Sequence, residues 1–306
     1  MVADKKSIGP AEAGHSILKG PAEAGHYVLK LAVVFLLSVV VSGFSRTVIC
    51  QTTPQRIVSL IPSVTETLFA IGAGPRVVGV SNFDRFPPEA ATKTKVGGLI
   101  DPDIERILSL KPDLVVVYGT QTDLRAQMAR ARVPMFLYEH AGLADITATI
   151  RDVGRRVGNQ QAAVMLADRI DADIAAVRRR VAGTRRPRTL LVFGRDGETL
   201  RGIYASGALG FLHDMLEAAG GANVFGDVKR QSIQATTELI LARAPDVIIE
   251  VESTGTPNTK AWDALPSVPA VRSHRVYLLQ GDEMVNPGPR VAHAIQRMAA
   301  VLHPEQ

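Results

Sequence analysis

Two glutamates occupy matching positions in an internal repeat of the 306-residue chain. The stretch ERILSLKPDLVV runs from Glu105 to Val116, and ELILARAPDVII runs from Glu238 to Ile249. In each copy the glutamate begins a short segment that stops at a proline, and a run rich in β-branched residues follows. A carboxylate in the first turn of a helix stabilises that helix by about 0.3–1 kcal/mol. The repeat therefore predicts two equivalent helix-to-strand units, each with an acidic residue at the start of its helix.

Side chains that could bind a metal ion or a haem iron are few and are spread along the chain. A bare metal ion needs several ligands that converge, and the candidates are Glu139, His140, His213 and Asp282. A haem iron needs an axial ligand such as His or Tyr, and the candidates are Tyr118, His140 and Tyr204. Metal-ion binding and haem binding therefore stay open as alternatives.

Motifs that mark common enzymes are absent from the sequence. It contains no G-x-S-x-G elbow, no Walker A loop and no H-E-x-x-H. The stretch from Gly72 to Gly74 follows a predicted helix and precedes a predicted strand, which is the reverse of the order in dinucleotide-binding folds. We therefore predict no catalytic residues. A metal-handling enzyme on a similar two-lobed fold is the alternative from another class, and turnover would reveal it.

The charge balance argues against a nucleic-acid partner. Residues 51–306 carry 30 Lys and Arg against 27 Asp and Glu, once the five basic and three acidic residues of 1–50 are subtracted from the totals of 35 and 30. The densest basic runs flank the end of a long predicted helix and lack the interleaved aromatic residues of a nucleic-acid-binding surface. With 46% apolar and 21% charged residues, the chain has enough apolar side chains for two ordinary cores.

The first 50 residues have the pattern of segments that precede a folded protein. GPAEAGHSILK at 9–19 returns almost unchanged as GPAEAGHYVLK at 20–30, and two copies are too few to build a repeat fold, so we expect residues 1–30 to be non-structural. The apolar run of 31–41 is shorter than the ~20 residues that span a bilayer, but it suits a signal peptide over 31–50. We therefore expect export to the periplasm or the cell envelope. Cys50, the sole cysteine, is a candidate lipid anchor, although Ile49 stands where a small residue is expected.

The longest predicted element is a helix over Gln160–Val181. Asn159 stands at its N-cap position, and Arg178 to Arg180 gather at its C-terminal end, where the helix dipole favours positive charge. At 1.5 Å per residue the helix would be roughly 33 Å long, about the width of a small domain. Its apolar residues recur at helical spacing and form one stripe: Ala163, Leu166, Ala167, Ile170, Ile174, Val177 and Val181.

On either side of this helix, predicted strands alternate with predicted helices. The pattern indicates an α/β fold of two similar lobes with central β-sheets, with an N-terminal lobe at 55–158, a joining helix at 159–182 and a C-terminal lobe at 187–306. A cleft between two such lobes is a usual place for a ligand. The expected strands include 56–61, 76–80, 134–138, 189–193 and 275–279, the expected helices include 145–157, 208–219 and 290–302, and 194–207 and 280–289 are expected to be loops.

Two local predictions concern single residues. Ser63 and Glu66 have the spacing of a capping box at the start of a helix that ends near Gly72. Trp262, the sole tryptophan, is predicted to lie in the core of the second lobe rather than at a ligand.

Several stretches, in order along the chain, resemble the helical-backbone class of ABC-transporter substrate-binding proteins. They are RIVSLIPSVTETLFAIGAGPRVVGVSNF at 56–83, VGGLIDPDIERILSLKPDLVVV at 96–117, GGANVF at 220–225, TTELILARAPDVII at 236–249 and PGPRVAHAI at 287–295. The resemblance covers residues 55–304 and implies a cargo of cobalamin, a ferric siderophore, haem or a metal ion. The VGG-x-x-x-P stretch before Glu105 and the PGPR stretch look most like those of cobalamin-binding members.

The resemblance also implies partners. In this class a glutamate on each lobe docks onto arginines of the membrane permease, and by matching motif these residues are Glu105 and Glu238. Two symmetric carboxylates suit a two-fold permease dimer. We therefore expect a monomer that works with an ABC importer permease and its ATPase and that has no intrinsic cofactor.

Contacts with the ligand are implied in the same way. Phe83, Leu99, Tyr118 and Tyr204 lie where the class places aromatic or apolar contacts with a large flat ligand, and Asp282 matches an acidic contact of cobalamin binders. Leu99 stands where a tryptophan can stand, and Asn286 stands where an arginine can. We expect cobalamin as the ligand, with a ferric siderophore, haem or a metal ion as alternatives. Because one helix joins the lobes, we expect only a small closure on binding.

Overall fold

The computed structural model describes residues 53–139, 142–253 and 258–305. The predicted non-structural segment 1–30, the predicted signal peptide 31–50, Cys50 and His140 lie outside these ranges. Within the ranges, no helix is both long enough and apolar enough to cross a membrane.

The first lobe is built on a parallel sheet. Within the described residues this sheet has five strands in the order β3-β2-β1-β4-β5. Its central strands are continuous apolar runs, as expected when helices cover both faces of a parallel sheet. The strands are β1 (Ile57–Ser59), β2 (Val77–Val80), β3 (Thr94–Lys95), β4 (Leu114–Tyr118) and β5 (Met135–Tyr138), and the helices are α2 (Pro62–Ala70), η1 (Gly74–Arg76), α3 (Pro88–Ala91), α4 (Ile104–Ser109), α5 (Thr122–Arg130) and α6 (Leu143–Arg156).

The second lobe has a mixed sheet. The described strands run in the order β11-β10-β6-β7-β9, with β8 paired to β6, and β7 and β9 are antiparallel to their neighbours. The strands are β6 (Arg188–Gly194), β7 (Ile203–Ser206), β8 (Ala222–Asn223), β9 (Ser232–Ala235), β10 (Val247–Glu252) and β11 (Val276–Gln280), and the helices are α8 (Phe211–Ala218), α9 (Thr237–Arg243), η2 (Lys260–Ala264), α10 (Pro269–Arg272), η3 (Asp282–Met284) and α11 (Val291–Leu302). The prediction of a loop over 194–207 was wrong, because β7 lies inside it.

The internal repeat is confirmed as two helix-to-strand units. α4 leads into β4 and α9 leads into β10, and each of these strands pairs in parallel with the first strand of its lobe. The repeated aspartate has a structural role in both copies. Asp113 accepts hydrogen bonds from the backbone N–H groups of Gln55 and Arg56, at 2.7 and 2.8 Å, and Asp246 accepts one from Arg188 at 3.2 Å. Each aspartate therefore ties the start of β1 or β6 to the start of the neighbouring strand.

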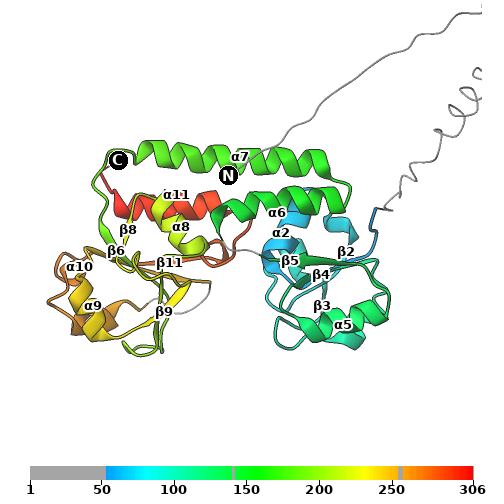
Figure 1. Cartoon of the computed structure of the whole chain (residues 1–306), viewed down its shortest axis with the longest axis horizontal. Helices are drawn as coiled ribbons and strands as arrows, with labels where there is room; N and C mark the ends of the chain where they lie inside the picture. Colours follow the sequence, from blue (N-terminus) through cyan, green and yellow to red (C-terminus); the bar gives the residue numbers. More distant parts are fainter. Residues whose placement is uncertain (1–52, 140–141, 254–257, 306) are drawn as a thin grey trace, which may run out of the picture. The chain divides into compact units, whose positions relative to one another are not determined.

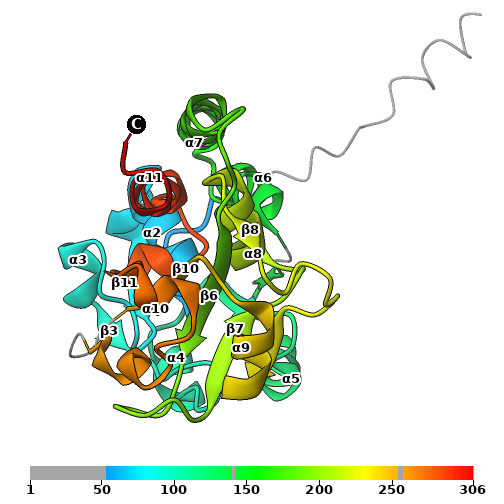
Figure 2. The ribbon, with the colours of Figure 1, turned by 90° about the vertical axis from the view of Figure 1, so that its left-hand side faces the viewer.

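The joining helix α7 (Gln160–Arg180) packs mainly against α6 and α11. Figure 1 shows it running along one side of both lobes, and Figure 2 shows α7 and α11 at the end of the second lobe opposite α9. The apolar stripe is confirmed, with most of its residues buried in a core that extends into both lobes. At the α6–α7 contact, a Cβ on Gly154 would lie 2.1 Å from the Cβ of Ala163, so the two helices approach as closely as glycine permits.

The predicted capping box at Ser63 and Glu66 was wrong, and the predicted N-cap residue Asn159 holds its position without a capping hydrogen bond. α2 begins at Pro62, and Ile61, which has no capping side chain, is its N-cap residue. Proline suits the first turn because its missing N–H would have no helical partner there. Asn159 is the N-cap residue of α7, as predicted, but its side chain forms no capping bond, because the amide donates to the Ile71 carbonyl and accepts from the Arg76 guanidinium. Both polar side chains at these helix starts, Glu66 and Asn159, serve long-range contacts instead.

Candidate ligand-binding site

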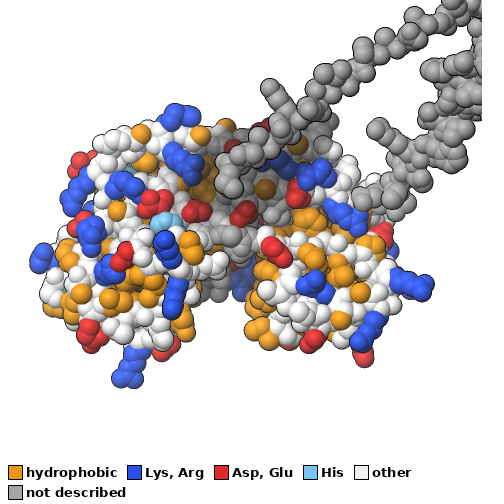
Figure 3. All heavy atoms as spheres, in the orientation of Figure 1, with side chains coloured by type: hydrophobic (Ala, Val, Ile, Leu, Met, Phe, Trp, Pro, Cys, Tyr) orange, Lys and Arg blue, Asp and Glu red, His pale blue; other side chains and the backbone are white. Residues whose placement is uncertain are grey.

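A pocket of about 250 Å³ lies between the two lobes. Four of the five side chains predicted to contact the ligand line it: Phe83, Leu99 and Tyr118 from the first lobe and Asp282 from the second. The other lining residues are Leu60, Pro62, Arg85, Ser253, Val285 and Asn286. Figure 3 shows a notch between the lobes on the side away from α7.

The topology explains why residues far apart in sequence meet here. Leu60, Phe83 and Tyr118 lie at or after the carboxyl ends of β1, β2 and β4, which run parallel in one sheet. Ser253 and Asp282 follow β10 and β11, which run parallel in the other sheet. Because the carboxyl ends of parallel strands share one edge, each sheet presents its loops to the same cleft, as is usual for open α/β sheets.

Tyr204 lies beside a second, neighbouring pocket rather than in this one. It stands on β7, with its ring 6.3 Å from the ring of Phe193. Phe193 lines an apolar pocket of about 410 Å³ that shares Val285 with the first pocket. Leu209 also lines this second pocket and is 49% exposed.

Large apolar side chains stand exposed around both pockets. Phe83 is 61% exposed, and Leu99 and Tyr204 are each 46% exposed. Exposed apolar side chains that gather around a hollow, rather than standing singly, are typical of a ligand or partner site.

One ion pair crosses the pocket. The Arg85 Nη1 of the first lobe lies 3.6 Å from the Asp282 Oδ1 of the second, and their side chains are 48% and 19% exposed. Asp282 was predicted from the sequence and Arg85 was not, although Arg85 lies in the turn-rich stretch that follows β2, two residues after Phe83. The pocket therefore offers one anionic and one cationic group, side by side.

Buried polar side chains hold the first-lobe wall of the pocket in place. Gln121, which is 8% exposed, accepts from the Tyr118 N–H at 3.0 Å and donates to the Leu99 carbonyl at 2.9 Å, so it joins two lining segments. Ser81 accepts from the Phe83 N–H at 3.2 Å and donates to the Asp84 carboxyl at 2.5 Å. These residues do not line the pocket, and a single sequence gives no signal for them.

Burial shifts the titration of two groups at this wall. It raises the pKa of the Asp84 carboxyl, and the hydrogen bond from Ser81 offsets only part of that effect. It also raises the pKa of the Tyr118 phenol, and the nearby Asp84 raises it further. Tyr118 is therefore held as a neutral phenol.

Glu139, His213 and Asp282, the candidate metal ligands that the structure describes, do not converge. Among the residues that the structure describes, no group of three or more His, Cys, Asp or Glu is placed to hold a metal ion. His213 Nδ1 lies 3.2 Å from the Asn223 amide nitrogen in the second lobe, and Glu139 lies against Gly119 in the first. Of the candidate axial ligands for haem, Tyr118 lines the interlobe pocket and Tyr204 does not.

Glu105 and Glu238 hold the same position in their two helices. Each is the second residue of its helix, and each is exposed. The N-caps are other residues: Asp103 accepts from the Arg106 N–H at 2.9 Å, and Thr236 accepts from the Leu239 N–H at 3.3 Å. Within the described part of the chain neither glutamate forms an ion pair. Figure 2 shows α4 and α9 both on the side away from α7.

The predicted core position of Trp262 is confirmed. It is 1% exposed, and its indole Nε1 donates to the Glu250 carboxylate at 2.9 Å. Arg195 donates to the same carboxylate at 2.6 Å, so the polar end of the tryptophan belongs to a buried ion pair within the second lobe.

With this fold and this pocket in place, comparison with known proteins defines the class. The chain belongs to the periplasmic binding protein family, whose model matches residues 57–283. It is 31% identical over 267 residues to the cobalamin-binding protein of Halobacterium salinarum, a match that covers 82% of this chain and 70% of the relative.

Solved structures agree with this assignment. The periplasmic vitamin B12-binding protein of Vibrio cholerae superposes with a TM-score of 0.73 at 24% identity, over 83% of this chain and 99% of that one. The periplasmic haem-binding protein RhuT from a Roseiflexus species superposes with a TM-score of 0.70 at 27% identity, over 82% of this chain and 98% of that one.

Together these similarities define an ABC-transporter substrate-binding protein of the class that carries cobalamin, siderophores or haem. The family consists of solute-binding transport proteins that lie outside the cytoplasm and work with a permease and an ATPase.

Proposed function

We propose that this protein binds cobalamin in the interlobe pocket and delivers it to an ABC importer. The observation that carries the choice of cobalamin is the Arg85–Asp282 pair, which places one donor group and one acceptor group at the wall of a pocket that Phe83 and Leu99 also line. Primary amides surround the corrin ring of cobalamin, and an amide can donate to Asp282 and accept from Arg85 at the same time.

The same pair disfavours haem. Haem carries two propionate carboxylates, and a propionate beside Asp282 would be repelled by its negative charge. Arg85 is a single cation, and it already neutralises Asp282. Haem iron also needs an axial ligand. Tyr118 is the candidate for that role in the pocket, and burial with the neighbouring Asp84 raises its pKa, which opposes formation of the phenolate.

The size and polarity of the cleft support a large ligand. The interlobe pocket has about 250 Å³, the neighbouring apolar pocket has about 410 Å³, and Val285 lines both. Ligand pockets commonly measure about 300–1,000 Å³ and are mostly apolar with a few polar groups that fix orientation. A ligand that spans both pockets would cover Phe83, Leu99 and Tyr204.

Calorimetric titration of the purified protein with cyanocobalamin, haemin and a ferric siderophore tests the ligand. We expect a one-to-one isotherm with cobalamin, and Arg85→Ala should weaken the affinity roughly 10- to 150-fold, because a lost charge-assisted hydrogen bond is worth about 1.5–3 kcal/mol. Arg178→Ala, on an exposed position of α7, is the control and should change nothing. Saturation by haemin with no heat from cobalamin would overturn the ligand and leave the importer role intact.

We also propose that Glu105 and Glu238 dock onto the permease. Their equivalent, exposed positions on the same side of the two lobes support this role. Glu105→Ala and Glu238→Ala should each lower cobalamin uptake in cells while leaving cobalamin affinity in solution unchanged. Glu198→Ala, an exposed glutamate of the second lobe, is the matched control. Normal uptake in the double variant would refute the docking role.

For the N-terminal segment we propose export by the signal peptide over 31–50. If cleavage falls immediately before Cys50, this residue becomes the first of the mature protein and would carry a lipid. Labelling of growing cells with radioactive palmitate should mark the protein and should fail to mark Cys50→Ser. N-terminal sequencing of the exported protein identifies the cleavage point, and a mature N-terminus beyond residue 50 would exclude the lipid anchor.

A further inference from the structure

Two stretches that the sequence analysis singled out meet at the boundary between the lobes. One contains Ser63 and Glu66 at the start of α2, and the other is the PGPR stretch at 287–290, just before α11. A Cβ on Gly288 would lie 3.3 Å from the Cβ of Ser63, so the backbone of the second lobe rests directly on α2 of the first. Glycine permits this close approach.

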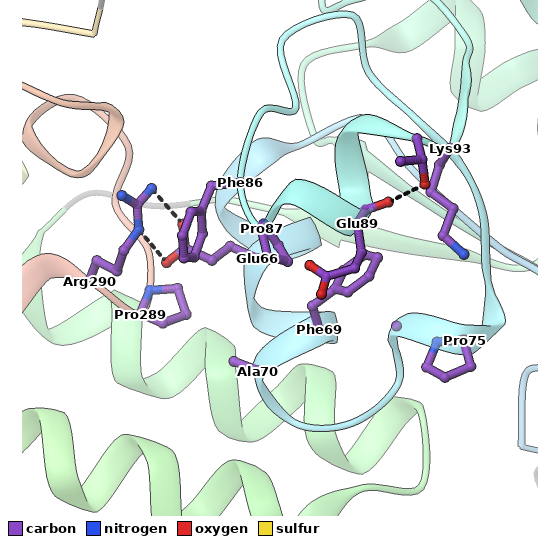
Figure 4. A pocket seen from close by; sticks show the side chains of 12 residues that line it. Glu66, Phe69, Ala70, Pro75, Phe86, Pro87, Glu89, Lys93, Pro289 and Arg290 are labelled. Atoms are coloured by element: carbon purple, nitrogen blue, oxygen red, sulfur yellow. Dashed lines mark hydrogen bonds and ion pairs between the residues drawn. The ribbon is translucent and has the colours of Figure 1, made fainter.

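Arg290 joins the two lobes at this point. Its Nε and Nη2 donate to the two carboxylate oxygens of Glu66 at 2.9 and 3.0 Å, and its Nη1 donates to Glu283 at 2.9 Å. The guanidinium also lies 4.0 Å from the ring centroid of Phe86. Figure 4 shows Arg290, Glu66 and Phe86 together at one end of a cavity of about 660 Å³. The Glu66 and Glu283 side chains are only 7% and 9% exposed, so both charges depend on their arginine partners.

The ion pairs of Arg290 also hold η3, the turn that carries Asp282 into the pocket. Arg297 on α11 donates to Glu283 at 2.7 Å and to the Gln280 carbonyl at 2.6 Å. Glu283 lies within η3, directly between Asp282, which faces the pocket, and Met284, which is buried. Val285, which lines both pockets, is the next residue after η3. We name Glu66, Glu283, Arg290 and Arg297 the seam cluster.

We infer that the seam cluster positions Asp282 and Val285 against the first-lobe wall and thereby sets how long the ligand stays bound. This inference rests on the proposed function, because it assumes that the ligand occupies the pocket beside Asp282. A bidentate arginine–carboxylate pair fixes direction as well as distance, and it adds a direct link between the lobes to the one that α7 makes by packing against α6 and α11. With the seam cluster in place, the lobes are joined both by α7 and by the pair of Arg290 with Glu66, and their relative angle is fixed.

Arg290→Lys tests the inference, because lysine keeps the charge but cannot donate to both carboxylates with a planar fork. Stopped-flow measurement should show cobalamin dissociating about ten-fold faster, the effect of losing about one charge-assisted hydrogen bond. The association rate should change little. Arg178→Lys on α7 is the matched control and should leave both rates unchanged.

A second measurement needs no ligand and separates this inference from the proposed function. With Cys50 replaced by serine, spin labels at Gln127 in the first lobe and Arg272 in the second report the interlobe distance. We expect Arg290→Lys to broaden the distance distribution of the free protein and the control to leave it narrow. If Arg290→Lys does not fold, Glu66→Gln replaces it in both measurements.

The outcomes are distinct. An unchanged distance distribution in a folded variant would overturn the positioning role, whatever the ligand. A broadened distribution with an unchanged dissociation rate would show that the seam cluster fixes the lobes without governing the ligand, and it would also overturn the inference. If the wild-type protein does not bind cobalamin, the proposed function fails, while the distance measurement still decides the role of the seam cluster at the lobe boundary.

Discussion

Removing Arg290 should destabilise the protein far more than removing its partner Glu66. In Arg290→Gln, two nearly buried carboxylates, Glu66 and Glu283, lose a cation that binds both. Removing one partner from a buried ion pair typically costs about 3–5 kcal/mol. For a folded unit of this size, each kcal/mol lowers the Tm by about 2–4 °C, so we expect a fall of roughly 6–20 °C at pH 7 in thermal unfolding followed by circular dichroism.

Glu66→Gln should be much milder. Burial raises the pKa of Glu66, and the hydrogen bond and charge of Arg290 offset only part of this effect, so the ionised carboxylate carries a net cost at neutral pH. For Glu283, burial pushes the pKa upward, but its own backbone N–H, Arg297 and Arg290 outweigh burial, and its pKa is lowered. When Glu66 is replaced, Arg290 therefore keeps a fully ionised partner in Glu283, and we expect a change within about 1 kcal/mol.

The pH dependence of the Tm deficit of Arg290→Gln tests whether the loss comes from uncompensated carboxylates. Without Arg290, the pKa values of both carboxyls in the folded state should rise, since the cation that lowers them is gone. A carboxyl with a raised folded-state pKa contributes stability that is present at low pH and is lost as pH rises through that pKa. The Tm deficit of Arg290→Gln should therefore shrink below about pH 5. The reasoning is refuted if the deficit is under about 2 °C at pH 7, or if it stays constant with pH. In addition, Glu66→Gln combined with Arg290→Gln should be more stable than Arg290→Gln alone.

Three further changes test other parts of the structure by thermal unfolding. Gly154→Ala should cost about 1–3 kcal/mol because its Cβ would collide with Ala163, and Ala163→Gly in the same chain should restore stability. Arg195→Met should lower the free energy of unfolding by about 3–5 kcal/mol, because it leaves the Glu250 carboxylate, whose side chain is 3% exposed, without its cation. Adding Glu250→Gln should recover most of that loss. Asp84→Asn should flatten the pH dependence of stability, because the raised pKa of Asp84 makes the wild type lose stability as pH rises through it; an unchanged slope would contradict the assignment.

Local patterns predicted much of the fold. The stripe of α7 is regular over the whole helix, and a helix that packs on one face needs such a stripe. The two copies of the Glu-to-Asp repeat predicted α4–β4 and α9–β10. In each copy a proline ends the helix, and the β-branched run that follows favours a strand. β7 and β9 were missed since each has only four residues and pairs antiparallel at the side of the sheet.

The site was predicted less completely, for a physical reason. Phe83 and Leu99 lie in motifs of a known class, and Tyr118 and Asp282 lie close to such motifs, so resemblance found all four. Arg85, Gln121 and the seam cluster act through contacts between distant residues, such as the pair of Glu66 with Arg290, which are 224 positions apart. A single sequence gives the types of such residues but not their partners. The Ser63–Glu66 spacing was interpreted as a local cap, whereas the glutamate is used across the lobe boundary.

The repeated aspartates also bear on how the chain folds. The hydrogen bond from the Arg56 N–H to Asp113 joins residues 57 positions apart in sequence, and that from the Arg188 N–H to Asp246 joins residues 58 positions apart. The entropy lost on closing a flexible segment depends on the logarithm of its length, so the two lobes face nearly the same cost to pair β1 with β4 and β6 with β10. Neither half should then wait for the other to nucleate, and early protection from hydrogen exchange should develop at β1–β4 and β6–β10 in parallel.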